Sequence, residues 1–320
     1  MTKSFLVAAV LCLAGFSAAA QQYPSKPIKF VAGYPPGGGM DNVSRALAEK
    51  LSPRLGQQVV VENRPGAGGA IGNDAVAKSA PDGYTLLVGP IGGQAILQYT
   101  QPKRTYDFGR DFAAISRIGY GTIIFVVPAN SKAQSVKDFV AMAKAAPGRL
   151  NFASSGFGAL IHLTGEMFKQ AAGVDLTHVP YKGTTQILPD LLDGRIDVAL
   201  DSAPAYLPHL KAGRVRALAV AAPKRSALMP ELPTMAEAGV PGVVSQTDYA
   251  LYAPAGTPRE AIALLNREVN AVLQMEDFRA RMASMGIEVA GGTAESLQAE
   301  YTDELDKWAR VIREAGLKFD

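Results

Sequence analysis

Residues 33–51 are GYPPGGGMDNVSRALAEKL, a stretch that combines the end of a strand, a bare loop and the start of a helix. The run PIKFVAG (27–33) has the composition of a buried strand, and the two prolines and three glycines that follow bring it to an end. From Asp41 onward, apolar residues recur at every fourth position, which predicts an amphipathic helix. A strand followed by a loop and a helix is the building unit of α/β proteins.

The loop between this strand and this helix is suited to approach a negatively charged group. Three successive glycines, Gly37, Gly38 and Gly39, let the backbone come close to a ligand. The first N–H groups of a helix have no partner within the helix and carry a partial positive charge, so they favour anions. The alternative is a plain tight turn in which Asp41 caps the helix. In that position the carboxylate would compete with a bound anion, unless the anion used the preceding loop amides.

A second stretch, NFASSGFGALIHLTGEMF (151–168), repeats the order of strand, small polar loop and helix. It offers hydroxyl groups, open backbone and an imidazole one turn into the helix, in Ser154, Ser155, Gly156, Gly158 and His162. Ligands of open α/β sheets bind at the carboxyl ends of strands. One such loop in each half of the chain therefore predicts a site where the two loops meet.

Strand-like and helical segments alternate along the chain, which predicts an α/β fold with two parallel or mixed sheets flanked by helices. The stretch 112–128 has strand character with a break at Gly-Tyr-Gly. We predict two lobes joined by a hinge, in which lobe 1 comprises 23–122 plus 223–320 and lobe 2 comprises 123–222. The alternatives are a simple tandem arrangement and one large α/β domain.

The N-terminus has the features of a secretory signal peptide. Lys3 lies in a short basic start, an apolar run follows, and three alanines at 18–20 form a cleavage pattern, so we expect residues 1–20 to be removed after Ala20. The single cysteine, Cys12, lies within this segment, so the mature chain would contain no disulfide. We therefore expect the protein to be exported across the inner membrane.

The charge balance argues against nucleic acid and membrane surfaces as partners. The chain has 32 basic and 29 acidic residues and no block of like charge. After the N-terminal segment, no apolar run is long enough to span a membrane. We therefore expect a soluble, monomeric protein that does not insert into the membrane.

Several patterns resemble enzyme or metal motifs without completing them. The glycines in VVVENRPGAGGAIG (59–72) lack the spacing of a dinucleotide fingerprint, so we expect this loop to pack in lobe 1 or to border the cleft. His162 and Glu166 share a helix face, but no H-E-x-x-H motif is present and the other two histidines are remote in sequence. Ser155 lacks the preceding glycine of a nucleophile elbow. We predict no catalytic residue, no metal and no cofactor.

Longer stretches resemble the Bug or TctC family, the extracytoplasmic solute receptors of tripartite tricarboxylate transporters. The resemblance covers the whole mature chain and is most specific in LGQQVVVENRPGAGGAIGNDAVAKSAPDGYTLLVG (55–89). Further similar stretches are YPSKPIKFVAGYPPGGGMD (23–41), YDFGRDFAAISRIG (106–119), HVPYKGTTQILPDLLDGRIDVALD (178–201) and YAPAGTP (252–258). The resemblance implies a type II periplasmic-binding-protein fold that binds a small organic carboxylate between its lobes, largely through main-chain amides.

By this resemblance, the binding role falls on the two loops. The residues expected at the ligand are Tyr34, Gly37, Gly38, Gly39, Met40, Asp41, Ser154, Ser155, Gly156, Phe157, Gly158, His162 and Asp201. For Asp201, at the end of a lobe 2 strand, a role as helix cap remains the alternative. Family members often carry Ser or Thr where this chain has Met40 and Ala159, and Phe157 adds an apolar ring. We therefore expect an apolar or aromatic carboxylate rather than a hydroxylated one such as citrate.

The predicted function is that of a periplasmic receptor that captures this carboxylate and delivers it to the membrane subunits of a tripartite transporter. Two alternatives remain open, an exported enzyme on the same scaffold and a receptor that feeds a signalling sensor.

Overall fold

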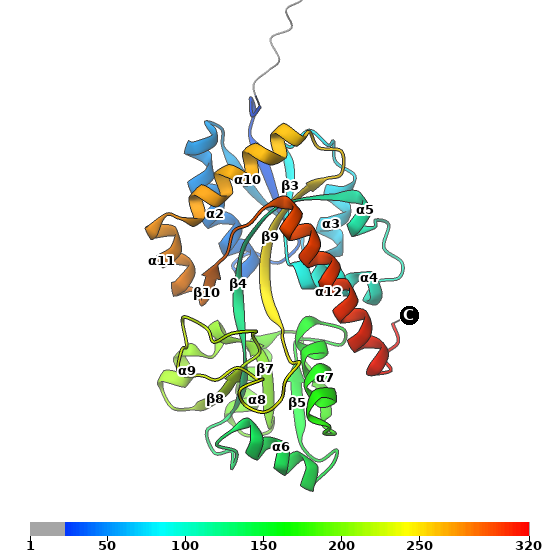
Figure 1. The fold of residues 1–320 in the computed structure, drawn as a ribbon, viewed down its shortest axis with the longest axis vertical. Coiled ribbons are helices and arrows are strands. Elements are labelled where there is room, and N and C mark those ends of the chain that lie inside the picture. The colour runs from blue at the N-terminus through cyan, green and yellow to red at the C-terminus, as the bar shows by residue number, and fades with distance from the viewer. Residues whose placement is uncertain (1–22, 320) are drawn as a thin grey trace, which may run out of the picture.

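The computed structural model describes residues 23–319, so the predicted signal peptide lies outside the described residues. Figure 1 shows two lobes stacked along the long axis and joined by two long strands, β4 (Phe112–Pro128) and β9 (Gln246–Pro254). Within 23–319, no helix combines the length and the apolar character that crossing a membrane requires.

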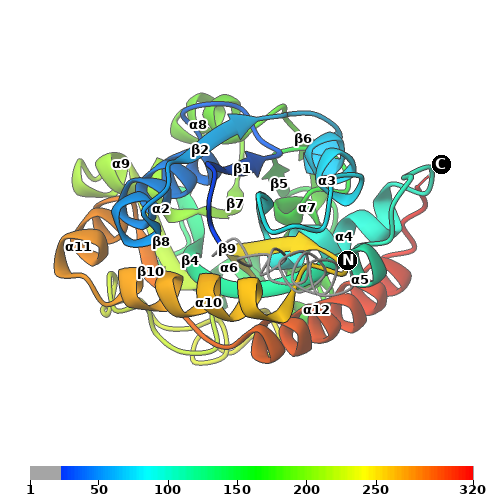
Figure 2. The same cartoon turned by 90° about the horizontal axis from the view of Figure 1, so that it is seen from above.

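Lobe 1 is assembled from both ends of the chain. Its N-terminal elements are β1 (Ile28–Ala32), α2 (Gly39–Leu55), β2 (Val59–Asn63), η1 (Ala67–Gly69), α3 (Ala70–Ala77), β3 (Thr85–Gly89), α4 (Ile91–Thr100) and α5 (Phe108–Asp111). Its C-terminal elements are α10 (Arg259–Leu273), α11 (Glu276–Ser284), β10 (Ile287–Val289) and α12 (Ala294–Glu314). In the view from above, α10 and α12 follow one another along one side of the molecule, where both pack on β4 (Figure 2).

Lobe 2 is a continuous α/β series. Its elements are α6 (Val136–Ala145), β5 (Asn151–Ser154), α7 (Leu160–Ala172), β6 (Thr177–Pro180), α8 (Thr184–Leu192), β7 (Val198–Ser202), η2 (Ala203–Ala205), α9 (Leu207–Lys211) and β8 (Val215–Val220). The predicted α/β class with mixed sheets and flanking helices is confirmed: β1 pairs in parallel with β2 and β3, β5 pairs in parallel with β6 and β7, and β4 and β9 run antiparallel to their neighbours.

The predicted break in the strand 112–128 is wrong, because β4 runs through the Gly-Tyr-Gly sequence without interruption. Gly119 lies where β10 pairs with β4, and a Cβ at this position would come within 2.5 Å of the Glu288 carbonyl oxygen. The glycine therefore permits close approach of two strands instead of ending one.

The strand register brings the carboxyl ends of strands from both lobes to one boundary. The first part of β4 pairs with β9, with Thr122 opposite Gln246, and the next part pairs with β7, with Ile123 opposite Ser202. β1 and β3 run toward this junction from lobe 1, antiparallel to β9, and β5 and β7 run toward it from lobe 2. The carboxyl ends of these four strands therefore face the space between the lobes.

The proline-rich segment after β8 stays with lobe 2. The Val220 N–H donates to the Pro233 carbonyl, the Met235 N–H donates to the Val220 carbonyl, and the Ser245 N–H donates to the Ala221 carbonyl. We therefore propose that the first crossing lies near 122, as expected, and the second near 246 instead of 222.

The core is continuous between the lobes. One cluster of buried side chains includes Leu87 and Ile91 of lobe 1 and Phe125 and Phe168 of lobe 2, with Trp308 of α12 in the same cluster. The cluster spans both lobes because α12 starts in lobe 1 and runs alongside α7 of lobe 2 (Figure 1). A second cluster fills lobe 1 beneath α2 and α10, and a third fills lobe 2 around α8 and β8.

Candidate ligand-binding site

The loop before α2 leaves the start of the helix open. Gly37, Gly38 and Gly39 are exposed, and Gly37 has a φ of 80°, which favours glycine. Gly38 is the N-cap residue and has no side chain to satisfy the first turn. Among the described residues, no side chain accepts a hydrogen bond from the N–H of Gly39 or Met40. The Met40 side chain itself is buried in the lobe 1 core, so this residue can offer a ligand only its N–H group.

Asp41 holds the loop instead of capping the helix. Its carboxylate accepts the Gly37 N–H at 2.9 Å and the Asn63 side-chain amide at 2.9 Å, and it pairs with Arg45 at 2.9 Å. Burial opposes its charge, but hydrogen bonds from Arg45, Gly37 and Asn63 outweigh this and lower the pKa of Asp41. The expected competition between Asp41 and a bound anion therefore does not arise in the first turn of α2.

The glycine-rich loop 59–72 supports this arrangement. The Asn63 amide donates both to Asp41 and to the Tyr34 carbonyl, and the Tyr34 hydroxyl donates to the Gly68 carbonyl at 3.0 Å. A Cβ on Gly33 would come within 2.9 Å of the Gly69 backbone, so the two loops touch directly. Burial raises the pKa of Tyr34, which is therefore a neutral phenol. The sequence patterns did not single out Asn63, although it is the last residue of β2 in the most specific stretch.

The lobe 2 loop is held together from within. Ser154 is buried; its hydroxyl lies 2.7 Å from His178 Nε2 and accepts the Gly156 N–H at 3.2 Å. The Gly158 N–H donates to His162 Nδ1 at 3.0 Å. Three of the expected ligand residues, Ser154, Gly158 and His162, thus use their polar groups to shape the loop.

Other groups of this loop remain open to a ligand. Ser155 is half-buried, and the Phe157 side chain is 58 % exposed. α7 begins after Ala159, which provides no side-chain cap. Among the described residues, no side chain accepts from the N–H of Leu160 or Ile161. The start of α7 in lobe 2 therefore matches the start of α2 in lobe 1.

Two histidines lie stacked beneath this loop. The His162 and His178 rings are 3.9 Å apart with an angle of 14° between their planes. Burial and nearby positive charge lower the pKa of His162 to about 3 and that of His178 to about 4, so both are neutral at pH 7. Because Nδ1 of His162 accepts from Gly158, its proton lies on Nε2. Parallel pairing of β5 and β6 brings His178 to this place, opposite Phe152, although it is remote in sequence.

Asp201 is engaged in its own lobe. It is 1 % exposed and accepts the Tyr206 hydroxyl at 3.0 Å and the Ser202 N–H at 2.7 Å. Burial raises the pKa of Asp201, and hydrogen bonds from Ser202, Thr184 and Tyr206 oppose this rise. The carboxylate therefore links the end of β7 to the start of α8 and to η2.

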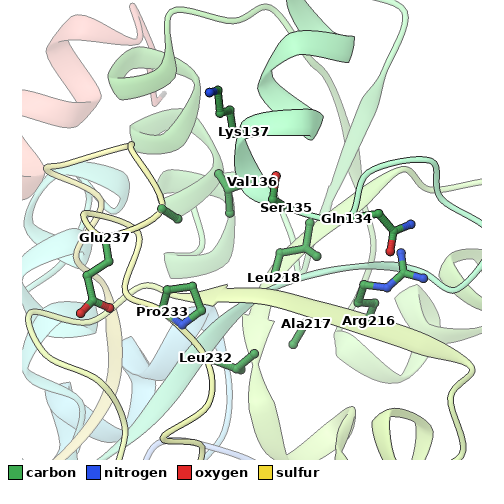
Figure 3. A pocket seen from close by; sticks show the side chains of 11 residues that line it. Gln134, Ser135, Val136, Lys137, Arg216, Ala217, Leu218, Leu232, Pro233 and Glu237 are labelled. Carbon is green, nitrogen blue, oxygen red and sulfur yellow. The ribbon is translucent and has the colours of Figure 1, made fainter.

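The described residues contain no group of three or more His, Cys, Asp or Glu side chains placed to hold a metal ion. A cavity of about 510 Å³ lies on lobe 2 between the start of α6, β8 and the segment near Pro233 (Figure 3). Another, of about 360 Å³, lies beside Tyr120 and Glu288. Neither is lined by a residue of the two loops, so the loop geometry, not cavity size, defines the candidate site.

Two lobes joined by two strands, with open helix starts at the facing strand ends, define a solute-binding protein of the periplasmic type. The chain belongs to the TctC family, described as the tripartite tricarboxylate transporter family receptor, whose sequence profile matches residues 43–317. The resemblance to the Bug and TctC receptors is thereby confirmed. Receptors of this family bind solutes in the periplasm.

Individual relatives agree with this assignment. BugT of Bordetella pertussis is 38% identical over 322 residues, covering 99% of each chain. A Rhodopseudomonas palustris structure with adipate superposes with a TM-score of 0.82 at 34% identity, covering 93% of this chain and all of the other. The structure of MatC from the same organism with bound malate has a TM-score of 0.76 at 30% identity, covering 91% of this chain and all of the other.

Proposed function

We propose that the protein captures a small organic carboxylate between the loop 37–41 and the loop 154–158 and delivers it to the membrane subunits of a tripartite transporter. The observation that carries the proposal is the pair of helices, α2 and α7, that start without a side-chain cap at strand ends facing each other. The relatives with adipate and malate support a carboxylate as the ligand.

The charge of the ligand would be balanced by backbone dipoles. The imidazoles of the lobe 2 loop are neutral, and Arg45 is already paired with Asp41. A hydrogen bond to a charged group contributes about 1.5–3 kcal/mol. About four such bonds at the two helix starts approach the roughly 8 kcal/mol of a micromolar complex, when ordering costs are small.

We propose an apolar or aromatic carboxylate as the ligand class. Phe157 presents a largely exposed ring beside the open start of α7. At Met40 and Ala159 the helix starts carry no hydroxyl that could bind a hydroxylated acid, and the Met40 side chain is turned into the core. Citrate binding more tightly than adipate and benzoate would overturn this part of the proposal.

The experiment is a thermal-shift panel of adipate, benzoate, malate and citrate on the mature protein. A ligand at 100 times its Kd stabilises the folded state by about 2.7 kcal/mol. Gly38→Val should abolish this shift because the side chain occupies the space of the anion. Its fold should persist, since Gly38 has a φ of −76° and a Cβ there would meet nothing closer than 3.4 Å.

Gly109→Val in α5 is the matched control, because Gly109 is also exposed and a Cβ there would meet nothing closer than 3.5 Å. It should bind like the wild type. Equal affinity of Gly38→Val and the wild type would contradict the proposed site.

The alternatives are separated by other measurements. Conversion of a bound acid into a product would favour an exported enzyme over a receptor. Uptake that persists after deletion of the gene, together with loss of a transcriptional response, would favour a signalling receptor.

N-terminal sequencing of the exported protein tests the expected cleavage after Ala20, and analytical sedimentation tests whether the protein is a monomer.

A further inference from the structure

The segment after α12 contacts the loop 154–158 of lobe 2. After α12, Gly316 adopts a φ of 64°, and the Leu317 N–H turns back to the Ile312 carbonyl at 3.2 Å. This turn ends the helix and directs the last described residues back along the molecule. Leu317 and Phe319 both pack against the apolar cluster that joins the lobes.

The Phe319 ring packs against Phe157 and Gly158 of this loop. The Phe319 ring lies 5.3 Å from the Phe157 ring, with an angle of 48° between their planes. A Cβ on Gly158 would come within 2.7 Å of Phe319 and within 3.3 Å of Thr100 at the end of α4. Gly158 has a φ of 74° as well, so this position requires glycine for both space and conformation.

The contact continues through the loop to the buried histidines. Phe157 lies 5.0 Å from His162, whose Nδ1 accepts the Gly158 N–H. His162 in turn stacks on His178. Phe319 is therefore one end of a series of contacting aromatic rings that continues through Phe157 and His162 to His178. Phe157 nevertheless keeps 58 % of its side chain exposed, which leaves much of its ring free to contact a ligand.

We propose that the C-terminal tail is part of the binding site: Phe319 positions Phe157 and the loop 154–158, and the two rings form an aromatic wall that favours carboxylates with an apolar chain or ring. The proposal rests on the proposed function for its ligand, but the contact between tail and loop stands by itself. Without Phe319, the loop would be less ordered before binding, so that more conformational entropy would be lost on binding.

The test compares Phe319→Ala with Phe319→Tyr, which keeps the ring, and with Lys318→Ala, a change at an exposed neighbour in the same tail. In the ligand-free protein, Phe319→Ala should accelerate hydrogen exchange of the peptide that contains Gly158. Adipate and benzoate should bind about three- to tenfold more weakly, the range expected for loss of one aromatic pair, and malate should lose less. The other two variants should behave like the wild type.

Unchanged exchange at Gly158 in Phe319→Ala would overturn the positioning role. Equal losses for benzoate and malate, or none, would overturn the aromatic wall. If the wild type bound none of the carboxylates, the proposed function would fail, whereas the exchange experiment would still decide the role of the tail.

Discussion

Asp248 is a buried carboxyl group in β9, one of the two strands that join the lobes. It accepts the N–H groups of Ile91 and Gly92 at the start of α4 and is 5 % exposed. Removal from water and, to a lesser extent, the nearby Glu304 carboxylate together raise the pKa of Asp248 to about 7, against smaller opposing effects of Arg117 and of the Ile91 and Gly92 N–H groups. Asp248 therefore provides for α4 the side-chain acceptor that the starts of α2 and α7 lack.

We predict that Asp248→Asn stabilises the protein, relative to the wild type, more at pH 8 than at pH 4. This change in the difference between their free energies of unfolding should be a few kcal/mol at most. The folded protein keeps the proton of Asp248 up to about pH 7, whereas the unfolded chain releases it near 3.8. The wild-type protein therefore loses stability as the pH rises from near 3.8 to about 7. Asn retains an acceptor for the two N–H groups and carries no charge.

Denaturant unfolding of both proteins at pH 4 and pH 8 measures this effect. His162 and His178 act in the opposite direction, because their lowered pKa values favour unfolding as the pH falls below about 6.5. The difference between variant and wild type, not the wild-type profile, thus isolates Asp248. The same difference at both pH values would contradict the prediction.

Strand β4 shows how one element serves both lobes. Its first part is flanked by β9 and β10, and its second part by β7 and β8. Two glycines near its middle have different surroundings. A Cβ on Gly119 would meet the Glu288 carbonyl oxygen at 2.5 Å, whereas one on Gly121 would meet nothing closer than 3.6 Å.

Gly119→Ala should therefore destabilise the protein by about 1–3 kcal/mol, because the methyl group forces β10 away from β4. Gly121→Ala is the matched control in the same strand and should change stability much less. Urea unfolding of the two variants, with the slope checked for constancy, makes the comparison. Similar stabilities for both variants would show that β10 can move away from β4 with little loss of folding free energy.

Sequence patterns predicted the separate elements well. The helix expected from Asp41 begins at Gly39, and the strand expected over 27–33 is β1 (Ile28–Ala32). Alternation and four-residue spacing act over short distances, so they are visible without knowledge of the fold. β10 has only three residues and was not predicted, because its place is set by its pairing with β4.

At the scale of the whole molecule, α12 makes the two lobes one unit. Trp308, the only tryptophan of the chain, is fully buried in the cluster that spans the lobes, and its indole N–H donates to Glu304 at 2.6 Å. Gln170 of α7 donates to the Val311 carbonyl of α12 at 3.2 Å. The lobes thus share apolar surface as well as two strands.

We predict that unfolding is a single cooperative transition. Tryptophan fluorescence reports the shared core, whereas far-ultraviolet circular dichroism reports both lobes, and the two should give the same midpoint. Two separated transitions by circular dichroism, with the fluorescence following only one, would show that the lobes unfold independently.

The α/β class, the family and the positions of the two loops could be predicted from the sequence, because strand and helix periods, glycine loops and family motifs are local in the chain. The contacts of each loop residue, in contrast, depend on the tertiary structure. Asp41, expected at the ligand, is held by Asn63, and Ser154 meets His178 across the pairing of two strands. Phe319 reaches the loop at Gly158 from the far end of the chain. Such partners are chosen by packing between segments distant in sequence, and neither period nor spacing carries that information.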